Sequence, residues 1–414
     1  SARPHMETGE FWNHQPLDAL LPHLVHAGSQ KVSDARRLTA FSIDILPARF
    51  YNKGAKSPVN TRWMNYDKSA PTENGEEYTM NGKERLDAYL AGKKADRRPN
   101  LTIGGSVVTQ YTGIDIERYS KDYKAMTESA VQAAIDLKLD FIQIASDLVR
   151  EAEGLGSEIA YFPDKLPTVR KYALDDITEV SRLRPLKTSE VRRMYDLVEA
   201  TAYARTLNSD SHPMTLAVGP ATIAGNTRGV EDLLVDMLDE EEAGEDLLNI
   251  ATETILDYIR TLASAGATYI YVADPVASLF SPSMYERFVL PCHRKIFGLM
   301  KELGIGSRLH MCGDTTKILP FSSTCGADIV DIDHAVNFAK ALEIADGRCL
   351  INGNIDPVAD VFSCDAAHTK QAILNAADSI GRARAMFMPG CELPTRTPLA
   401  NARAISEALE EIGG

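Results

Sequence analysis

A regular alternation of short apolar runs and longer helix-like segments constrains this chain more than any other feature. From about residue 78 onward, strand-length runs rich in apolar residues are separated by segments with helical periodicity, such as YKAMTESAVQAAIDLKL. Strands that alternate with helices form right-handed βαβ units around a parallel sheet, and eight of them predict a closed (β/α)8 TIM barrel. The eight runs are NLTIGGS (100–106), FIQIASD (141–147), MTLAVGP (214–220), TYIYVADP (268–275), SRLHMCG (307–313), ADIVDID (327–333), RCLINGN (348–354) and ARAMFMPG (383–390).

A doubly wound α/β sheet is the alternative to the barrel. No GxGxxG motif follows the first run, which disfavours a dinucleotide-binding fold. Residues 1–77 precede the alternating pattern and contain short amphipathic segments such as PLDALLPHLVHAG. We therefore predict a helical N-terminal extension over residues 1–77 and one barrel over residues 78–414. Residues 1–5 are typical of a cloning remnant before Met6.

The composition limits the class of protein and of partner. The net charge of −14 argues against a nucleic-acid partner, which requires a basic face. No apolar run approaches the roughly 20 residues that a membrane span needs, and the first residues lack the apolar core of a secretory signal. Six scattered cysteines in 414 residues favour reduced thiols over a disulfide framework. We expect a cytoplasmic enzyme with neither a membrane nor a nucleic-acid partner.

Polar residues end many of these runs, at the place where barrel enzymes carry their active sites. His310 and Cys312 end the fifth run, and because they are two residues apart in an extended chain they lie on the same face. Imidazole and thiolate are ligands that suit zinc. Cys391 follows the eighth run and reaches the same rim, and three protein ligands would leave one position open, as in catalytic zinc sites. The alternative is a buried strand that merely carries a His and a Cys.

Four segments of the chain resemble one known superfamily. The segments HMCGDTT, GADIVDIDH, INGNIDP and PGCELPTRTPLAN closely resemble the uroporphyrinogen decarboxylase superfamily over about residues 78–414. Within it, they are most similar to the zinc-dependent, corrinoid-linked methyltransferases, whose signature is His-x-Cys followed much later by Cys. The resemblance implies that His310, Cys312 and Cys391 bind Zn²⁺. Because the chain has no clean corrinoid-binding domain of its own, we expect the corrinoid (cobalamin) on a separate partner protein that docks over the barrel mouth.

The resemblance predicts methyl transfer between a small-molecule substrate and the cobalt of that corrinoid. We favour a methyl ether donor such as a methoxylated aromatic compound, because Tyr111, Tyr161 and Phe162 would suit an aromatic ligand. A thiol methyltransferase of the coenzyme M type, which uses the methyl-corrinoid, is the first alternative. A decarboxylase is a second, although no arginine-rich substrate loop lies near the first run, and a decarboxylase, which needs no metal, would give the three metal ligands no task. A zinc-stabilised barrel that only binds a ligand is the third.

The remaining polar residues at the ends of the runs are candidates for contacts with the substrate. Metal ligands and bound substrates need hydrogen-bond partners to hold their geometry. The predicted catalytic residues, which would orient the substrate or a ligating imidazole, are Asp274, Asn352 and Asn354. The predicted substrate-binding residues are Ser106, Asp147 and Asp333. The alternative for each is a structural role, because Asp, Asn and Ser commonly cap helices.

Overall fold

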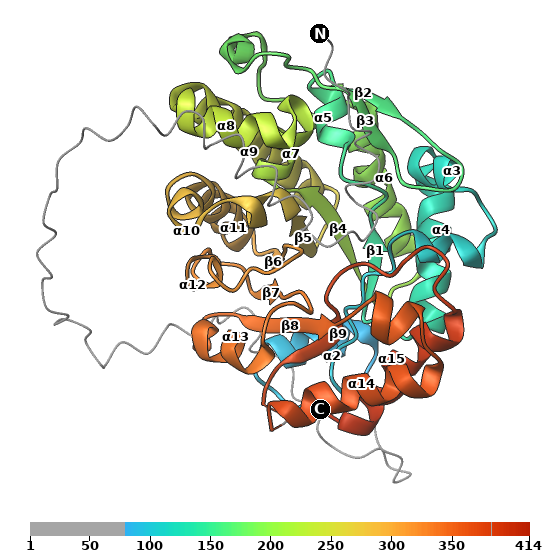
Figure 1. Ribbon diagram of the computed structural model, residues 1–414. Helices are drawn as coiled ribbons and strands as arrows, with labels where there is room; N and C mark the ends of the chain where they lie inside the picture. The colour runs from blue at the N-terminus through green and yellow to red at the C-terminus, as the bar shows by residue number, and fades with distance from the viewer. Residues whose placement is uncertain (1–78, 382) are drawn as a thin grey trace, which may run out of the picture. The chain divides into compact units, whose positions relative to one another are not determined.

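The computed structural model describes residues 79–381 and 383–414 (Figure 1). The predicted helical extension, residues 1–77, lies outside these residues. The core is a seven-stranded parallel sheet with helices on its outer face (Figure 1). In spatial order, the strands are β1 (Phe141–Ile144), β4 (His212–Val218), β5 (Tyr269–Ala273), β6 (Gly306–His310), β7 (Ile329–Asp331), β8 (Leu350–Ile355) and β9 (Met386–Pro389). Seven of the predicted runs therefore overlap the strands of this sheet.

The first predicted run is the exception, because residues 100–104 are irregular and form no ladder. They still connect the two edges of the sheet. The Asp140 amide, just before β1, donates to the Asn100 carbonyl (3.0 Å), and the Leu393 amide, after β9, donates to the Ile103 carbonyl (3.0 Å). The Asn100 side chain accepts the Thr102 amide (3.1 Å), which takes that amide out of any ladder. An irregular segment thus fills the eighth position of the barrel.

Helices follow the strands in the order that a barrel requires. The long helix α9 shows why they pack, since Leu248, Ala251 and Ile255 recur on the face that it buries. The helices are α2 (Gly82–Leu90), α3 (Ile116–Lys121), α4 (Tyr123–Asp136), α5 (Arg150–Gly154), α6 (Arg192–Leu207), α7 (Pro220–Arg228), α8 (Val230–Asp239), α9 (Glu241–Ser264), α10 (Pro282–Met284), α11 (Leu290–Glu302), α12 (Leu319–Ser322), α13 (Phe338–Ala345), α14 (Ala366–Ser379) and α15 (Leu399–Ile412). Among the described residues, no helix is long and apolar enough to cross a bilayer.

Two short elements in the connections were not predicted from the sequence. An antiparallel hairpin of β2 (Glu158–Ala160) and β3 (Thr168–Lys171) lies between α5 and α6. Its strands have few buried residues, so no apolar run announces them. A 3₁₀ helix, η4 (Gly105–Tyr111), follows the irregular segment and begins at a glycine with φ of +52°. Both elements belong to connections near the ends of barrel segments, where active-site residues gather.

The barrel interior contains a buried ion pair directly below the end of β6. Arg308 is fully buried, and its Nε lies 2.9 Å from both carboxylate oxygens of Asp331 on the neighbouring β7. Its Nη1 also donates to the Leu101 carbonyl (3.1 Å) in the irregular segment. Because side chains alternate along a strand, Arg308 shares the inward face of β6 with His310. The interior layer under the predicted metal site is therefore charged rather than apolar.

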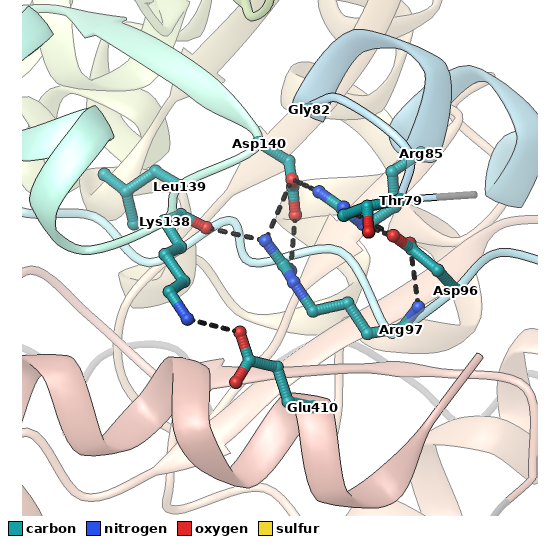
Figure 2. Close-up of a pocket in the computed structure, with 9 residues that line it drawn as sticks. All are labelled: Thr79, Gly82, Arg85, Asp96, Arg97, Lys138, Leu139, Asp140 and Glu410. Atoms are coloured by element: carbon teal, nitrogen blue, oxygen red, sulfur yellow. Dashed lines mark hydrogen bonds and ion pairs between the residues drawn. The ribbon is translucent and has the colours of Figure 1, made fainter. Parts of the chain in front are cut away.

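A second charged network lies where β1 begins, around a cavity of about 440 Å³ (Figure 2). Asp140 directly precedes β1 and is fully buried. Its carboxylate accepts hydrogen bonds from Arg85 and from Arg97 Nη1 (2.8 Å), and from the Asn100 amide (2.6 Å). Arg85 also pairs with Asp96 (2.6 Å). Figure 2 shows these side chains pointing toward one another, so helix α2 and the start of β1 are tied together.

Candidate functional site

The structure brings the three predicted metal ligands together. His310 is the last residue of β6, Cys312 follows it in the next loop, and Cys391 comes two residues after β9 ends. His310 Nε2 lies 3.2 Å from Cys312 Sγ and 3.9 Å from Cys391 Sγ, and the two sulfurs are 3.0 Å apart. Among the described residues, this is the only group of three or more His, Cys, Asp and Glu side chains placed to hold a metal ion.

The donor atoms fit a zinc ion in both spacing and chemistry. Zinc lies about 2.0–2.3 Å from nitrogen and sulfur ligands, so two of its ligand atoms are at most about 4.6 Å apart. The three measured separations of 3.0, 3.2 and 3.9 Å are all below that limit. His310 is 5% exposed, and both cysteines are half-buried. Two thiols and one imidazole therefore offer three of the four positions of a tetrahedral site.

The ionisation of the cluster supports the same conclusion. The hydrogen bond between the two sulfurs lowers the pKa of Cys391 well below its usual range and raises that of Cys312. Burial opposes the charged form of His310, but hydrogen bonds to Asp331 and Cys391 raise its pKa to about 10. The lowered pKa of Cys391 favours the thiolate, which is the form of cysteine that binds metal ions.

Asp331 fixes the orientation of the His310 ring. Its Oδ2 lies 2.8 Å from His310 Nδ1, so the opposite nitrogen, Nε2, faces the two sulfurs. Burial raises the pKa of Asp331, but Arg308 and then His310 lower it more, and the net shift is downward. A carboxylate behind a histidine ligand sets the tautomer and the ring angle. The sequence prediction did not assign this role to Asp331. The available signal was its position at the end of the run that follows His310.

Asn352 belongs to the same network, whereas Asp274 faces elsewhere. Asn352 Nδ2 donates to Asp331 Oδ1 (2.7 Å), which places Asn352 one hydrogen bond away from the carboxylate that holds His310. Asp274 is fully buried and accepts the Thr222 amide and hydroxyl, both at 2.7 Å, at the start of α7. Its other oxygen lies 3.0 Å from His293 Nε2 on α11. These contacts place Asp274 at a helix cap.

Asp333 and Gly390 shape the two loops that carry the cysteines. Asp333 Oδ2 accepts the Gly313 amide (3.0 Å), directly after Cys312, and its Oδ1 pairs with His334 Nδ1 (2.6 Å). Burial raises the pKa of Asp333, but the hydrogen bond to His334 contributes to a net downward shift. A Cβ atom on Gly390 would lie 2.6 Å from the His334 amide nitrogen. Glycine at this position therefore lets the loop that carries Cys391 approach the loop after β7. Asp333 therefore contacts the loop next to the cluster.

Ser106 lies against the loop that carries Cys391. Ser106 in η4 is 2% exposed, and its hydroxyl is 2.7 Å from the Thr395 hydroxyl. Gln110, one turn further along η4, donates to the carbonyls of Thr395 (2.9 Å) and Thr397 (3.1 Å). Together with the Leu393 amide bonded to Ile103, these contacts hold the loop after Cys391 to the segment that closes the barrel.

Asp147 and Asn354 make contacts that secure other loops. Asp147 is 4% exposed and pairs with Arg193 and with Arg150 (3.5 Å), at the start of α6 and α5. Burial raises the pKa of Asp147, but the two guanidinium groups outweigh it and lower that pKa to about 2. Asn354 is half-buried, and its Nδ2 donates to the Val336 carbonyl (2.5 Å). The structure therefore places both residues in loop-anchoring hydrogen bonds.

The predicted aromatic residues also have partners outside the cluster. The Tyr111 hydroxyl donates to Asp136 on α4 (2.6 Å), and the Tyr161 hydroxyl donates to Glu153 on α5 (2.9 Å). The Phe162 ring packs under the Lys165 ammonium at 4.1 Å. None of these contacts involves a residue of the metal cluster, so the aromatic walls expected from the sequence are formed, if at all, by other side chains.

Glu392 is a residue of the site that sequence reasoning missed. It directly follows Cys391, and burial together with the charge of Cys391 raises its pKa to about 7. Burial raises the pKa of the Tyr119 and Tyr271 phenols, and the Glu392 charge raises it further. The signal was present in the sequence, because an acidic residue next to a metal-ligating cysteine changes the charge of the site.

A comparison with known families decides the membership of this chain. The model of the family "Uroporphyrinogen decarboxylase (URO-D)" matches residues 81–412. The chain belongs to the uroporphyrinogen decarboxylase family. The resemblance predicted from the sequence is thereby confirmed, and family members among the relatives include both methyltransferases and decarboxylases.

Three curated relatives span this family. The chain is 26% identical over 343 residues to the methylcobamide:CoM methyltransferase MtbA of Methanosarcina acetivorans, covering 81% of this chain and 98% of the relative. It is 27% identical to a methylated-thiol–coenzyme M methyltransferase of Methanosarcina mazei, covering 80% and 90%. It is 24% identical to the uroporphyrinogen decarboxylase of Carboxydothermus hydrogenoformans, covering 79% and 96%.

A solved structure supports the fold of this family member. A methyltransferase from Methanosarcina mazei superposes with a TM-score of 0.70 and 22% sequence identity, covering 80% of this chain and 99% of that one. At this level of identity the likeness concerns the fold. It confirms the predicted α/β barrel class, with the irregular segment 100–104 in the place of one strand.

Proposed function

We propose that this protein is a metal-dependent methyltransferase that moves a methyl group between a small substrate and the cobalt of a corrinoid on a separate protein. The observation that carries the proposal is the His310, Cys312 and Cys391 cluster at the ends of β6 and β9, with His310 oriented by Asp331. Three protein ligands with one open position are typical of catalytic zinc. Two relatives are named as coenzyme M methyltransferases, one of them with methylcobamide.

The residues of such a site would have different roles. His310, Cys312 and Cys391 would hold a zinc ion, which supplies a Lewis acid that lowers the pKa of a thiol or stabilises a leaving oxygen. Asp331 keeps Nε2 of His310 directed at the sulfurs, and Arg308 balances the charge of Asp331 inside the barrel. Asp333 would hold the loop after Cys312, and Ser106 would hold the loop after Cys391.

A thiol acceptor is the first candidate substrate, because the relatives named above are coenzyme M methyltransferases. In this direction the substrate sulfur attacks the methyl carbon of methyl–Co(III). The sulfur–carbon bond forms as the cobalt–carbon bond breaks, the electron pair stays on cobalt as Co(I), and the thiol proton leaves to solvent. The protein would contribute by holding a zinc ion at His310, Cys312 and Cys391, beside which the substrate sulfur would be positioned for attack.

A methyl ether donor, such as a methoxylated aromatic compound, is the second candidate. The specific observation in its favour is the Tyr271 phenol, which lies 3.5 Å from Gln143, the residue that accepts the Gly105 amide beside Glu392. In this direction the methyl carbon is attacked by Co(I), the carbon–oxygen bond breaks, and its electron pair goes to the oxygen, which then takes a proton. The cobalt becomes methyl–Co(III), so atoms and charge balance.

A decarboxylase and a barrel that only binds a ligand have less support from the site. The segment that closes the barrel, residues 99–111, contains no arginine, and Arg97 just before it is bonded to Asp140 where β1 begins. A decarboxylase of polycarboxylate substrates needs several cationic contacts. A protein that only binds its ligand would not need an open three-ligand metal position. We place the reaction in the cytoplasm, because thiol ligands persist in reducing compartments.

The proposal is tested by the absorbance of free cobalamin mixed with zinc-loaded protein. Methyl-Co(III) cobalamin is offered with thiols, and Co(I) cobalamin with methoxyarenes, methanol and methylamines. Appearance of the Co(I) band with thiols establishes the first candidate, and loss of that band with methoxyarenes establishes the second. The Cys312→Ala variant is the matched control and is expected to be inactive in both arms. Unchanged spectra with every substrate class and zinc-loaded protein would contradict the proposed function.

A further inference from the structure

The loop that carries Glu392 is held firmly on both sides of that residue. The Gly390 amide donates to the Ile355 carbonyl at the end of β8 (2.7 Å), and the Leu393 amide donates to the Ile103 carbonyl in the closing segment (3.0 Å). Glu392 lies between these two anchors and directly after the candidate ligand Cys391. Its side chain therefore starts from a fixed backbone next to the metal cluster, which is the arrangement that a binding residue requires.

The Glu392 side chain lies against bare backbone at the start of η4. A Cβ atom on Gly105 would be 2.8 Å from Glu392 Oε2 and 2.9 Å from its Cδ. Gly105 also has φ of +52°, a conformation that other residues rarely adopt. Its amide donates to the side-chain carbonyl of Gln143 (3.2 Å) rather than to Glu392. Glycine at this position thus leaves the space that the carboxylate occupies, without binding it.

The carboxylate of Glu392 has no partner among the described residues. No hydrogen bond or ion pair there involves it, whereas the neighbouring acids Asp331 and Asp333 each have several partners. The side chain is half-buried and its oxygens are not among the enclosed polar atoms, so the carboxylate retains access to ligand. An accessible carboxylate without a protein partner can accept a hydrogen bond from a bound ligand.

The position of Glu392 indicates where a ligand group bonded to it would lie. Glu392 directly follows Cys391, and its carboxylate lies against Gly105, whose amide donates to the side-chain carbonyl of Gln143 (3.2 Å). The side-chain nitrogen of Gln143 is in turn 3.5 Å from the Tyr271 hydroxyl. The carboxylate therefore lies next to the metal cluster and near the contact between Gln143 and Tyr271. A substrate whose reacting atom is at the cluster would present its adjacent atoms to Glu392.

We propose that Glu392 accepts a hydrogen bond from a hydroxyl or ammonium group that the substrate carries next to its reacting atom. The substrate class is then a methyl ether or thiol with a donor on the neighbouring carbon, such as a 2-methoxyphenol, a hydroxythiol or an aminothiol. A sulfonate or carboxylate in that position is disfavoured, because it meets a like charge. The inference rests on the proposed function only in placing the reacting atom at the cluster.

Calorimetric titration of zinc-loaded protein tests the inference without requiring turnover. The first pair of probes is 2-methoxyphenol and anisole, which differ in one hydroxyl. The second set is 2-mercaptoethanol, cysteamine and 2-mercaptoethanesulfonate, which offer a hydroxyl, an ammonium and an anion beside the same thiol. Donor-bearing probes are expected to bind about tenfold or more tightly than their partners, the usual effect of a hydrogen bond to a charged group. The two thiol donors distinguish hydroxyl from ammonium. Equal affinity within the methoxyarene pair and within the thiol set overturns the inference.

The Glu392→Gln variant tests whether Glu392 causes the preference for donor-bearing probes. It keeps the shape and removes the charge, so the donor preference should fall by about tenfold and the anionic thiol should bind more tightly. Glu343→Gln, on the exposed face of α13, is the matched control and should keep the full preference. An undiminished preference in Glu392→Gln with normal zinc content assigns the selection to another residue. If donor-bearing probes bind more tightly but no methyl group is transferred, only the proposed function is contradicted. If a methyl group is transferred but the probes bind equally, only this inference is contradicted.

Discussion

Charged side chains gather at both ends of this barrel, but they are satisfied in different ways. Where β1 begins, Asp140 is bonded by Arg85, Arg97 and a backbone amide, so the network closes on itself (Figure 2). At the ends of β6 and β9, two cysteines and one histidine bring their donor atoms within 4.8 Å of one another. The first arrangement uses charge to hold the fold, and the second keeps charge available for something that arrives. Barrel enzymes commonly separate stability and function in this way.

The largest effect on stability is expected from removing Asp140 from the charged network where β1 begins. Asp140→Ala removes a fully buried carboxylate, which leaves the buried Arg97 guanidinium without its counter-ion and Arg85 with Asp96 alone. Breaking a buried pair on one side costs about 3–5 kcal/mol, so urea unfolding should show a loss of that size. The exposed Asp164→Ala is the control and should change stability by about 0.5 kcal/mol or less. A small loss in Asp140→Ala would mean that the network does not hold this end of the barrel.

A somewhat smaller effect on stability is expected at Asp147, whose charge we assign to a structural role at the barrel mouth. Arg193 and Arg150 lower the pKa of Asp147 to about 2, below its value of about 3.9 in the unfolded chain. A lowered pKa stabilises the fold above pH 4 and loses that contribution as the pH falls toward 2. The contribution is about 2 kcal/mol. In metal-free protein, the stability difference between wild type and Asp147→Asn should therefore shrink by that amount between pH 6 and pH 2. A constant difference would contradict the loop-anchoring role.

Asp331→Asn probes the link between the interior ion pair and the metal cluster. The substitution keeps the shape but weakens the hydrogen bond that orients His310. Zinc affinity, measured by competition with a chromophoric chelator, should fall by about 10- to 100-fold, the usual penalty for losing such a partner. Asp314→Asn, on the exposed loop after Cys312, is the control and should retain wild-type affinity. Unchanged affinity in Asp331→Asn would remove Asp331 from the site.

The smallest effect is expected at Asp274, which the sequence suggested as a catalytic residue. Its hydrogen bonds cap α7 and hold His293, so Asp274→Asn should cost about 1–2 kcal/mol of stability. Methyl transfer by the folded variant should stay within about twofold of wild type. Normal stability combined with a 10- to 100-fold loss of methyl transfer would instead place Asp274 at the substrate.

Much of the barrel was predictable, because buried parallel strands are continuous apolar runs. The run at 268–275 contains β5, and the run at 214–220 overlaps β4, which begins at His212. The run at 100–106 looks alike in the sequence but does not form a strand. There the backbone follows from one side-chain hydrogen bond, from Thr102 to Asn100, and from the positive φ of Gly105. Apolar periodicity carries no information about either feature.

The site shows the same division between local and three-dimensional information. His310 and Cys312 could be paired from the sequence, because alternate residues of a strand share a face. Cys391 could be added only through barrel closure and family resemblance. The contact of Asp331 with His310 depends on two strands lying side by side in one register, β6 against β7. The lack of a partner for Glu392 depends on everything around it. Neither can be read from spacing along the chain.

The central claim is that the three-ligand cluster binds a metal without being needed to hold the barrel together. The most direct test is the zinc content of wild type and Cys391→Ala by mass spectrometry, combined with urea unfolding of both proteins without metal. We predict about one zinc per wild-type chain, very little in the variant, and unfolding free energies that agree within about 1 kcal/mol. Full zinc content in Cys391→Ala, or a metal-free variant that no longer folds, would contradict the account.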